Sequence, residues 1–202
     1  MLKLRRVAVT GGIASGKSTV TSFFQKFGAY VVSADQIVHQ HLSSNTALIK
    51  QVITLLGEKI LQNGCIDKKK MADAVFEDLE LLHKLEAVIH PIVAHEIKEL
   101  WEKAQATKKY TLFVAEVPLL FEAGQDSWYD DTIAVVSPIE ACQMRFAKGV
   151  EEYQKRAARQ LTQGQKAKKA KFIIENTGSL AELEAKVASL YTLLSQGENL
   201  DI

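Results

Sequence analysis

Cysteine and long apolar runs are scarce in this sequence. Its 202 residues include only two cysteines, Cys65 and Cys142, and neither has a cysteine or histidine partner at metal-site spacing. We therefore expect two reduced thiols. The longest apolar stretches are short, such as residues 117–121, so no transmembrane helix is predicted. The basic residues at the start run into residues 10–12 without an apolar signal segment, which favours a cytoplasmic protein.

A surplus of charge of either sign is also missing. The chain has 25 Lys and Arg against 24 Asp and Glu, a formal net charge of +1. This balance argues against a protein that coats nucleic acid through bulk charge. Apolar residues make up 47% of the chain, and its length suits one domain or a core domain with an inserted subdomain. The sequence leaves the oligomeric state open, and a monomer is compatible with it.

Strand and helix patterns alternate at both ends of the chain. A β-branched run at residues 7–10 precedes a helical apolar face at Val20, Phe23, Phe24 and Phe27, with Gly28 at its end. A second strand follows at residues 30–32, and this βαβ order predicts a parallel sheet. Further strands are predicted at residues 111–114, 132–136 and 172–174. A capping box at residues 179–182 predicts the start of a final helix.

The middle of the chain is predicted to be helical. Residues 48–56 form one apolar helix face, residues 62–64 form a loop, and helical sequence runs from residue 67 to about residue 89. Pro91 then predicts the first turn of a new helix. A helical stretch of this length between the second and third strands predicts an inserted subdomain.

Residues 11–18 match the pattern G-x-x-x-x-G-K-S/T. Gly11 and Gly16 let several backbone N–H groups converge on one phosphate. Lys17 would bind the β- and γ-phosphates, and the Ser18 hydroxyl would bind Mg²⁺. Because the motif stands between a predicted strand and a predicted helix, it favours a nucleotide site over a simple glycine-rich turn. The N-K-x-D and D-x-x-G motifs of Ras-like GTPases are absent, which favours a small-molecule kinase.

Three further side chains are candidates for acceptor or metal chemistry. Asp35 ends the second strand, which we expect beside the P-loop strand, where its carboxylate would accept a proton from an attacking hydroxyl. The alternative for Asp35 is a helix N-cap. Glu116 follows the third predicted strand, where it would hold Mg²⁺ through water or serve only as a core-edge carboxylate. His90 would contact a substrate phosphate or ribose, or only cap the preceding helix.

Basic residues are concentrated between Arg145 and Lys171, where nine of them stand against two acidic residues. In a kinase, such a helical segment predicts a lid that closes over the nucleotide and neutralises the transferred phosphoryl group. The alternatives are a solvated basic face and a weak RNA contact. No aromatic residue lies between Tyr153 and Phe172, so this segment has no platform on which bases would stack.

In combination, these features resemble the dephospho-CoA kinase family over nearly the whole chain. The matching segments are TGGIASGKST (10–19), AD (34–35), GCID (64–67), VF (75–76), LEAVIHP (85–91), VPLLFE (117–122), Gln143 with Arg145, Arg156 with Gln160, and ENTG (175–178). The resemblance implies an α/β fold: a three-layer α/β/α P-loop nucleoside-triphosphate-hydrolase-like core with a parallel sheet, a helical CoA-binding insertion and a lid. The implied core spans about residues 1–40, 108–140 and 170–202, the insertion about 41–107, and the lid about 141–169.

The resemblance also implies an activity, in which MgATP phosphorylates the 3′-hydroxyl of the ribose of dephospho-CoA. Its partners are then ATP and dephospho-CoA, without nucleic acid or membrane. The implied catalytic residues are Asp35, Lys17 and Arg145. The implied ATP site is Gly11, Gly12, Ile13, Ala14, Ser15, Gly16, Lys17, Ser18 and Thr19, with Arg156. The acceptor pocket or its frame would include Asp35, His90, Pro91, Leu119 and Glu122, and Mg²⁺ would be held by Ser18 and Glu116. The competing hypotheses are another small-metabolite or nucleoside kinase and a nucleotide-dependent interaction protein.

Several positions depart from the family pattern. Ser33 stands where the family often has an aspartate, and Glu116 replaces a common aspartate with a side chain longer by one methylene. In the lid, the usual R-x-x-x-R-D-G pattern is one residue short, and Lys148 occupies the second basic position. A lysine lacks the bidentate phosphate contact of an arginine. The sequence therefore leaves open which lid residue contacts ATP.

Overall fold

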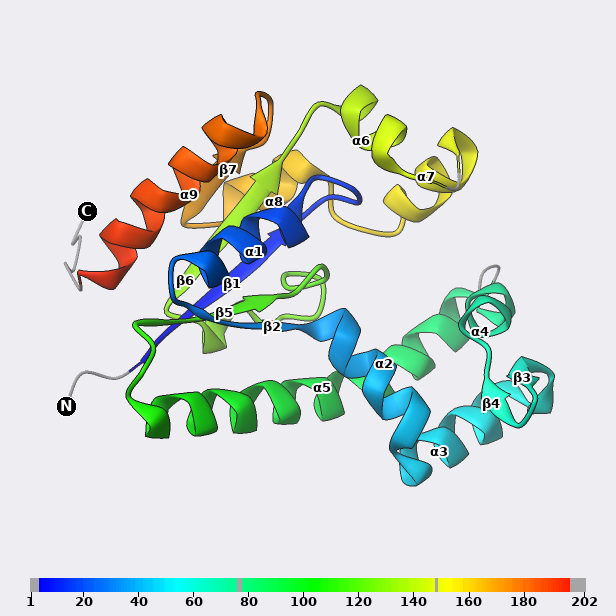
Figure 1. The fold of residues 1–202 in the computed structure, drawn as a ribbon. Helices are drawn as coiled ribbons and strands as arrows, with labels where there is room; N and C mark the ends of the chain where they lie inside the picture. The colour runs from blue at the N-terminus through cyan, green and yellow to red at the C-terminus, as the bar shows by residue number, and fades with distance from the viewer. Residues whose placement is uncertain (1–3, 76–77, 148, 197–202) are drawn as a thin grey trace. The chain divides into compact units, whose positions relative to one another are not determined.

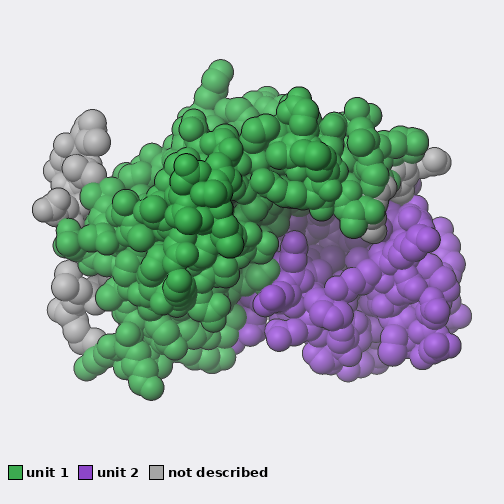
Figure 2. Space-filling view, turned by 45° about the horizontal axis from the view of Figure 1, so that its top comes forward, with its two compact units in different colours: residues 1–33, 100–202 green, residues 34–99 purple. Residues whose placement is uncertain are grey.

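The computed structural model describes residues 4–75, 78–147 and 149–196 (Figure 1). Two residues singled out above, Phe76 and Lys148, lie outside these ranges. The chain forms two compact units, coloured separately in Figure 2: residues 1–33 with 100–202, and residues 34–99. No helix in the described ranges has the length and apolar content needed to cross a membrane.

A five-stranded parallel sheet forms the centre of the first unit. Its strands are β1 (Arg5–Gly11), β2 (Tyr30–Ser33), β5 (Leu112–Glu116), β6 (Asp131–Val136) and β7 (Phe172–Glu175). Their order across the sheet is β2-β5-β1-β6-β7. The expectation that the second strand lies beside the P-loop strand is therefore wrong, because β5 pairs with both β1 and β2. The other predicted strands are confirmed within a residue or two at their ends.

Helices cover both faces of this sheet. Those of the first unit are α1 (Lys17–Lys26), α6 (Ile139–Arg145), α7 (Val150–Ala157), α8 (Gln163–Lys169) and α9 (Leu180–Ser195), with a 3₁₀ turn, η2, at Asp126–Trp128. Side chains alternate between the two faces of a strand. On one face, Val7 and Val9 of β1 pack in one buried cluster with α1 and α9. On the other, α8 packs against β1 and β6.

Local sequence signals define the ends of α1 and α9. The predicted α1 face is buried at Val20, Phe23 and Phe24, and the helix ends just before Gly28, whose φ is +106°. At the start of α9, the Ser179 N–H donates to Glu182 Oε2 at 2.6 Å. The Ser179 hydroxyl in turn accepts the Glu182 N–H at 3.3 Å, which confirms the predicted capping box.

The second unit is a contiguous, mainly helical segment. It contains α2 (Ala34–Ser44), α3 (Thr46–Leu56), a 3₁₀ turn η1 (Glu58–Ile60), the short antiparallel strands β3 (Leu61–Gln62) and β4 (Cys65–Ile66), α4 (Lys68–Ala74) and most of α5 (Leu79–Thr107). The predicted loop at residues 62–64 is the turn of the β3–β4 hairpin, with Asn63 and Gly64 at positive φ.

The prediction that Pro91 begins a new helix is wrong, because α5 continues through it. A proline inside a helix removes one backbone hydrogen bond and costs about 3 kcal/mol. Four apolar side chains on the same face, Leu85, Ile89, Val93 and Ile97, are all buried. Burial of each is worth about 1.5–3 kcal/mol, so together they offset the proline and keep the helix continuous.

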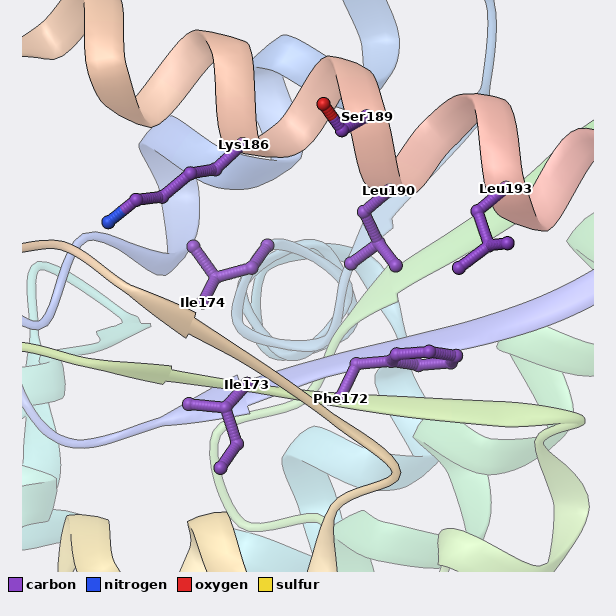
Figure 3. Close-up of a pocket in the computed structure, with 7 residues that line it drawn as sticks. All are labelled: Phe172, Ile173, Ile174, Lys186, Ser189, Leu190 and Leu193. Atoms are coloured by element: carbon purple, nitrogen blue, oxygen red, sulfur yellow. The ribbon is translucent and has the colours of Figure 1, made fainter. Parts of the chain in front are cut away.

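A shallow apolar groove runs along the edge strand β7 (Figure 3). Phe172 and Ile174 of β7 and Leu190 and Leu193 of α9 line it, with Lys186 at one end. The Lys186 ammonium donates to the Glu175 carbonyl at 2.7 Å. This groove shares no residue with the sequence motifs that predict a nucleotide site.

Candidate active site

The loop between β1 and α1 has a conformation that requires glycine at two positions. The φ angles of Gly11 and Gly16 are +151° and +101°. A Cβ atom on Gly11 would lie 2.3 Å from the Val135 carbonyl oxygen, and one on Gly16 would lie 2.3 Å from Asn176 Nδ2. A side chain at Gly11 would collide with backbone, and one at Gly16 would displace the Asn176 amide, so both positions favour glycine. The positive φ angles and the lack of space for a Cβ atom therefore explain why the motif has glycine at these two positions.

Side chains from the carboxyl ends of β6 and β7 hold this loop. Asn176 Nδ2 donates to the Ser15 carbonyl at 2.9 Å, and the Asn176 carbonyl accepts the Ser137 hydroxyl at 2.8 Å. Gln163, the first residue of α8, accepts the Ser137 N–H at 2.8 Å and packs its side chain beside Gly12. Sequence reasoning noted Asn176 only within a family match and missed Gln163 entirely.

The loop is built to receive an anion. Lys17 Nζ donates to the Gly12 carbonyl at 2.8 Å, so its charge is held over the loop. The first turn of α1 contains no acidic residue, and its N-cap, Gly16, provides no side-chain cap. The Ser15 hydroxyl is buried and has no hydrogen-bond partner among the described residues. A phosphate group in the loop would meet the helix N-terminus and the ammonium together.

The two predicted Mg²⁺ ligands, Ser18 and Glu116, are connected through the hydroxyl of Thr21. Thr21 Oγ1 lies 3.1 Å from the Ser18 carbonyl oxygen and 3.3 Å from Glu116 Oε2. Glu116 is half-buried at the end of β5, whereas Ser18 is exposed. Within the described ranges, no three His, Cys, Asp or Glu side chains form a metal cluster. Mg²⁺ commonly uses one or two protein oxygens plus substrate phosphates, and these two residues fit that pattern.

Asp35 is exposed in the first turn of α2. Because α2 begins at Ala34, Asp35 is inside the helix, and the alternative that it is an N-cap is wrong. It follows the carboxyl end of β2 by two residues, and in a parallel sheet this end lies at the same edge as the P-loop. His90 is half-buried and Pro91 exposed within α5, so His90 does not cap a helix end as one hypothesis held.

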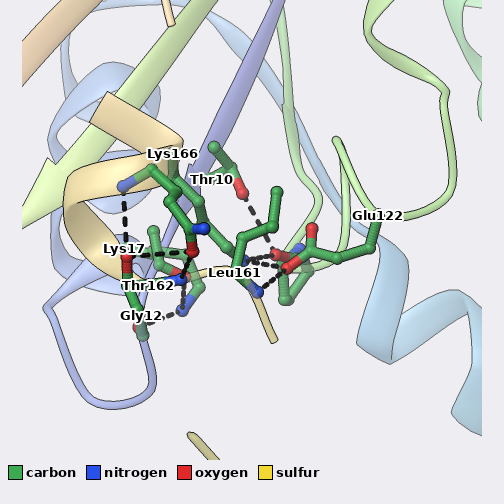
Figure 4. Close-up of polar contacts among 10 residues, drawn as sticks. Thr10, Gly12, Lys17, Glu122, Leu161, Thr162 and Lys166 are labelled. Atoms are coloured by element: carbon green, nitrogen blue, oxygen red, sulfur yellow. Dashed lines mark hydrogen bonds and ion pairs between the residues drawn. The ribbon is translucent and has the colours of Figure 1, made fainter. Parts of the chain in front are cut away.

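The segment after β5 is tied to α8 by an ion pair whose cation is buried (Figure 4). Lys166 is fully buried, and its Nζ lies 3.0 Å from Glu122 Oε1 and donates to the Pro118 carbonyl. Glu122 also accepts the Leu161 N–H at 2.9 Å. Burial lowers the pKa of the Lys166 ammonium, and the Glu122 carboxylate opposes that shift. Glu122 therefore fixes the position of this segment through its contacts. Leu119, which is half-buried, lies between Pro118 and Glu122.

Many of the basic residues between 145 and 171 have partners. Arg145 Nη1 donates to the Ser137 hydroxyl at 3.0 Å, which joins Arg145 to the group of residues that holds the P-loop. Arg156 pairs with Glu152 at 2.7 Å within α7 and lies over the Phe146 ring. Lys171 pairs with buried Asp131 at 2.9 Å. The structure thus brings Arg145 to the residues that hold the P-loop, whereas Arg156 contacts Glu152 and Phe146.

Comparison with known proteins gives a consistent result. The dephospho-CoA kinase family profile matches residues 5–182. A dephospho-CoA kinase of Protochlamydia amoebophila is 42% identical over 95% of this chain and 97% of its own. A crystal structure of a Thermus thermophilus protein matches with a TM-score of 0.78 and 30% identity, over 96% of this chain and 99% of the other. A dephospho-CoA kinase from Campylobacter jejuni matches with a TM-score of 0.70 and 29% identity, over 95% and 98%.

These matches extend over both units and include the P-loop, the Asp35 region and the segment after β5. The three-layer arrangement around a parallel sheet is the P-loop kinase fold that the sequence predicted. The chain belongs to the dephospho-CoA kinase family.

Proposed function

We propose that this protein transfers the γ-phosphoryl group of ATP to the 3′-hydroxyl of the ribose of dephospho-CoA, giving coenzyme A and ADP. The observation that carries the proposal is the anion-receiving P-loop in a chain that matches the family over residues 5–182. The proposed reaction involves no nucleic acid or membrane, and we assign it to the cytoplasm.

In this proposal the P-loop, residues 11–19, binds the phosphates of ATP through its backbone N–H groups. Lys17 leaves the Gly12 carbonyl, to which it donates at 2.8 Å, and binds the transferred phosphoryl group instead. Arg145 and Arg156 act from the lid, proposed at residues 141–169, and neutralise charge on the phosphates. Each of these cations exchanges a protein oxygen for a phosphate oxygen of ATP, so each has an acceptor both before and after ATP binds.

Asp35 is the proposed general base. Its carboxylate accepts the proton of the 3′-hydroxyl while that oxygen forms a bond to the γ-phosphorus. The bond between the γ-phosphorus and the oxygen bridging it to the β-phosphate breaks, and ADP leaves with that electron pair. The exposed position of Asp35 leaves the carboxylate accessible to an incoming hydroxyl.

The remaining proposed roles concern the acceptor and Mg²⁺. The acceptor binds to the insertion, proposed at residues 41–107, with His90 and Pro91, and to Leu119 in a segment framed by Glu122. Ser18 would hold Mg²⁺ directly, and Glu116 would hold it directly or through water. When bound, Mg²⁺ neutralises charge on the β- and γ-phosphates.

The test is a mass-spectrometric assay of the purified protein with ATP and Mg²⁺. Dephospho-CoA is the substrate, and adenosine, AMP and pantetheine phosphate are supplied in parallel as controls. The proposal expects coenzyme A and ADP to form together, and only with dephospho-CoA. Phosphorylation of a control compound in its place would assign a different acceptor. Binding of ATP without transfer to any compound would leave a nucleotide-dependent interaction protein.

A further inference from the structure

Lys166 is a fully buried cation for which the proposed reaction has no direct use. A buried ammonium is tolerated when oxygen atoms surround it. Here the oxygens are Glu122 Oε1, at 3.0 Å, and the Pro118 carbonyl. Both acceptors belong to the segment after β5, which also contains Leu119. Lys166 thus joins α8 to the segment that we place beside the acceptor.

The Pro118 carbonyl is shared with a second donor. Thr10, near the end of β1 and directly before the P-loop, donates to it through Oγ1 at 3.1 Å (Figure 4). Glu122 is shared in the same way, because Oε1 also accepts the Leu161 N–H at 2.9 Å. The carbonyl and the carboxylate are each fixed from two directions, so the backbone between Pro118 and Glu122 has little freedom to shift.

Gln163 stands one helical turn before Lys166 but contacts a different part of the site. Its side-chain amide forms two hydrogen bonds with the backbone of Ser137. Oε1 accepts the Ser137 N–H at 2.8 Å, and Nε2 donates to the Ser137 carbonyl at 3.1 Å. Its side chain also packs beside Gly12 of the P-loop. One short helix therefore supports the nucleotide loop through its first residue and the segment after β5 through its fourth.

We propose that Lys166 is a positioning residue for the acceptor: paired with Glu122, it fixes residues 118–122 so that the acceptor hydroxyl meets the γ-phosphate in line. Gln163 has the corresponding role for the P-loop and ATP. The inference rests on the proposed function, since it takes dephospho-CoA as the acceptor. Small displacements of a positioned group reduce transfer strongly, which gives this pair a measurable effect without any contact to the substrate.

The test compares Lys166→Met with Gln163→Leu in steady-state kinetics. Methionine keeps the length of the lysine stem and removes its charge, and leucine keeps most of the glutamine volume and removes both hydrogen bonds. For Lys166→Met we expect kcat to fall about tenfold and the KM for dephospho-CoA to rise, while the KM for ATP changes by less than about twofold. For Gln163→Leu we expect the opposite split. Each variant thus serves as the control for the other.

Circular dichroism and thermal melting establish that each variant is folded. If Lys166→Met alone is unfolded, the double variant Lys166→Met/Glu122→Gln carries the test, because it leaves no buried charge without a partner. Equal rises in both KM values, or a lower melting temperature with kcat and both KM values unchanged, would show a merely structural role and overturn the inference. Wild-type protein is assayed in parallel to distinguish failure of this inference from failure of the proposed function. If the proposed function is wrong, the wild-type protein will form no coenzyme A either.

Discussion

The fit of Gly16 against Asn176 makes a quantitative prediction about the P-loop. Replacement of Gly16 by alanine places a Cβ atom 2.3 Å from Asn176 Nδ2, on a residue whose φ is +101°. The left-handed backbone costs about 1–2 kcal/mol for an L-residue with a side chain. Displacement of Asn176 breaks its 2.9 Å hydrogen bond to the buried Ser15 carbonyl, which costs about 1–3 kcal/mol. The Gly16→Ala substitution should therefore lower the free energy of unfolding by roughly 2–5 kcal/mol.

Urea unfolding monitored by circular dichroism measures this loss as a shift in the midpoint at constant slope. For a chain of this size, each kcal/mol corresponds to about 2–4 °C, so the melting temperature should fall by roughly 4–20 °C. Gly124→Ala is the matched control. Gly124 also has a positive φ, +62°, but a Cβ there would have no atom within 4 Å. It should show the backbone cost alone, about 1 kcal/mol.

A second substitution separates steric contact from backbone strain. Asn176→Ala removes the atom that the new Cβ meets, so it should cost less in the Gly16→Ala background than in wild type. The expected coupling energy is about 1–3 kcal/mol. Additive effects in this cycle would refute the argument that Asn176 blocks a Cβ atom at residue 16. So would a Gly16→Ala variant that loses no more unfolding free energy than Gly124→Ala.

Three further predictions concern single side chains. Asp35→Asn should lower kcat by about 10²- to 10⁴-fold, because the proton acceptor is lost, while the KM for ATP is unchanged; parallel loss of ATP binding would make Asp35 structural. Lys17→Met should lower kcat by about 10²- to 10³-fold through lost charge stabilisation, and near-normal turnover would contradict its assigned role. Ser179 holds the pKa of Glu182 below 4.5 by hydrogen-bonding the charged carboxylate through its backbone N–H and hydroxyl. The folded state therefore takes up this proton at lower pH than the unfolded state, and its stability contribution is lost as the pH falls below about 4.5. Urea unfolding between roughly pH 6 and pH 3 should show this loss in wild type and not in Glu182→Gln; parallel curves would be evidence against it.

Features that depend on a few consecutive residues could be predicted from the sequence. The P-loop is one, because two glycines, a lysine and a serine at fixed spacing have little meaning outside a phosphate site. The start of α9 is another, since Ser179 and Glu182 satisfy each other's backbone groups across three positions. The parallel sheet followed from the βαβ order near the amino terminus.

Features that depend on distant residues could not be predicted. The position of β5 between β1 and β2 is a matter of pairing between strands far apart in sequence, which no local pattern encodes. The continuity of α5 through Pro91 depends on how deeply Ile89 and Val93 are buried in the folded unit. Lys166 resembles its basic neighbours in sequence, and only the folded chain reveals that Glu122 is opposite it.

The composition of the sheet cluster also has a consequence for synthesis of the protein. Val7 and Val9, from the beginning of the chain, are buried by Leu183, Val187 and Leu194, from near its end. A ribosome delivers these two sets at opposite ends of translation. The contiguous unit of residues 34–99 is synthesised as one block, whereas the cluster around β1 lacks its α9 members until the end of translation. The core on this face of the sheet is therefore complete only after α9 has been synthesised.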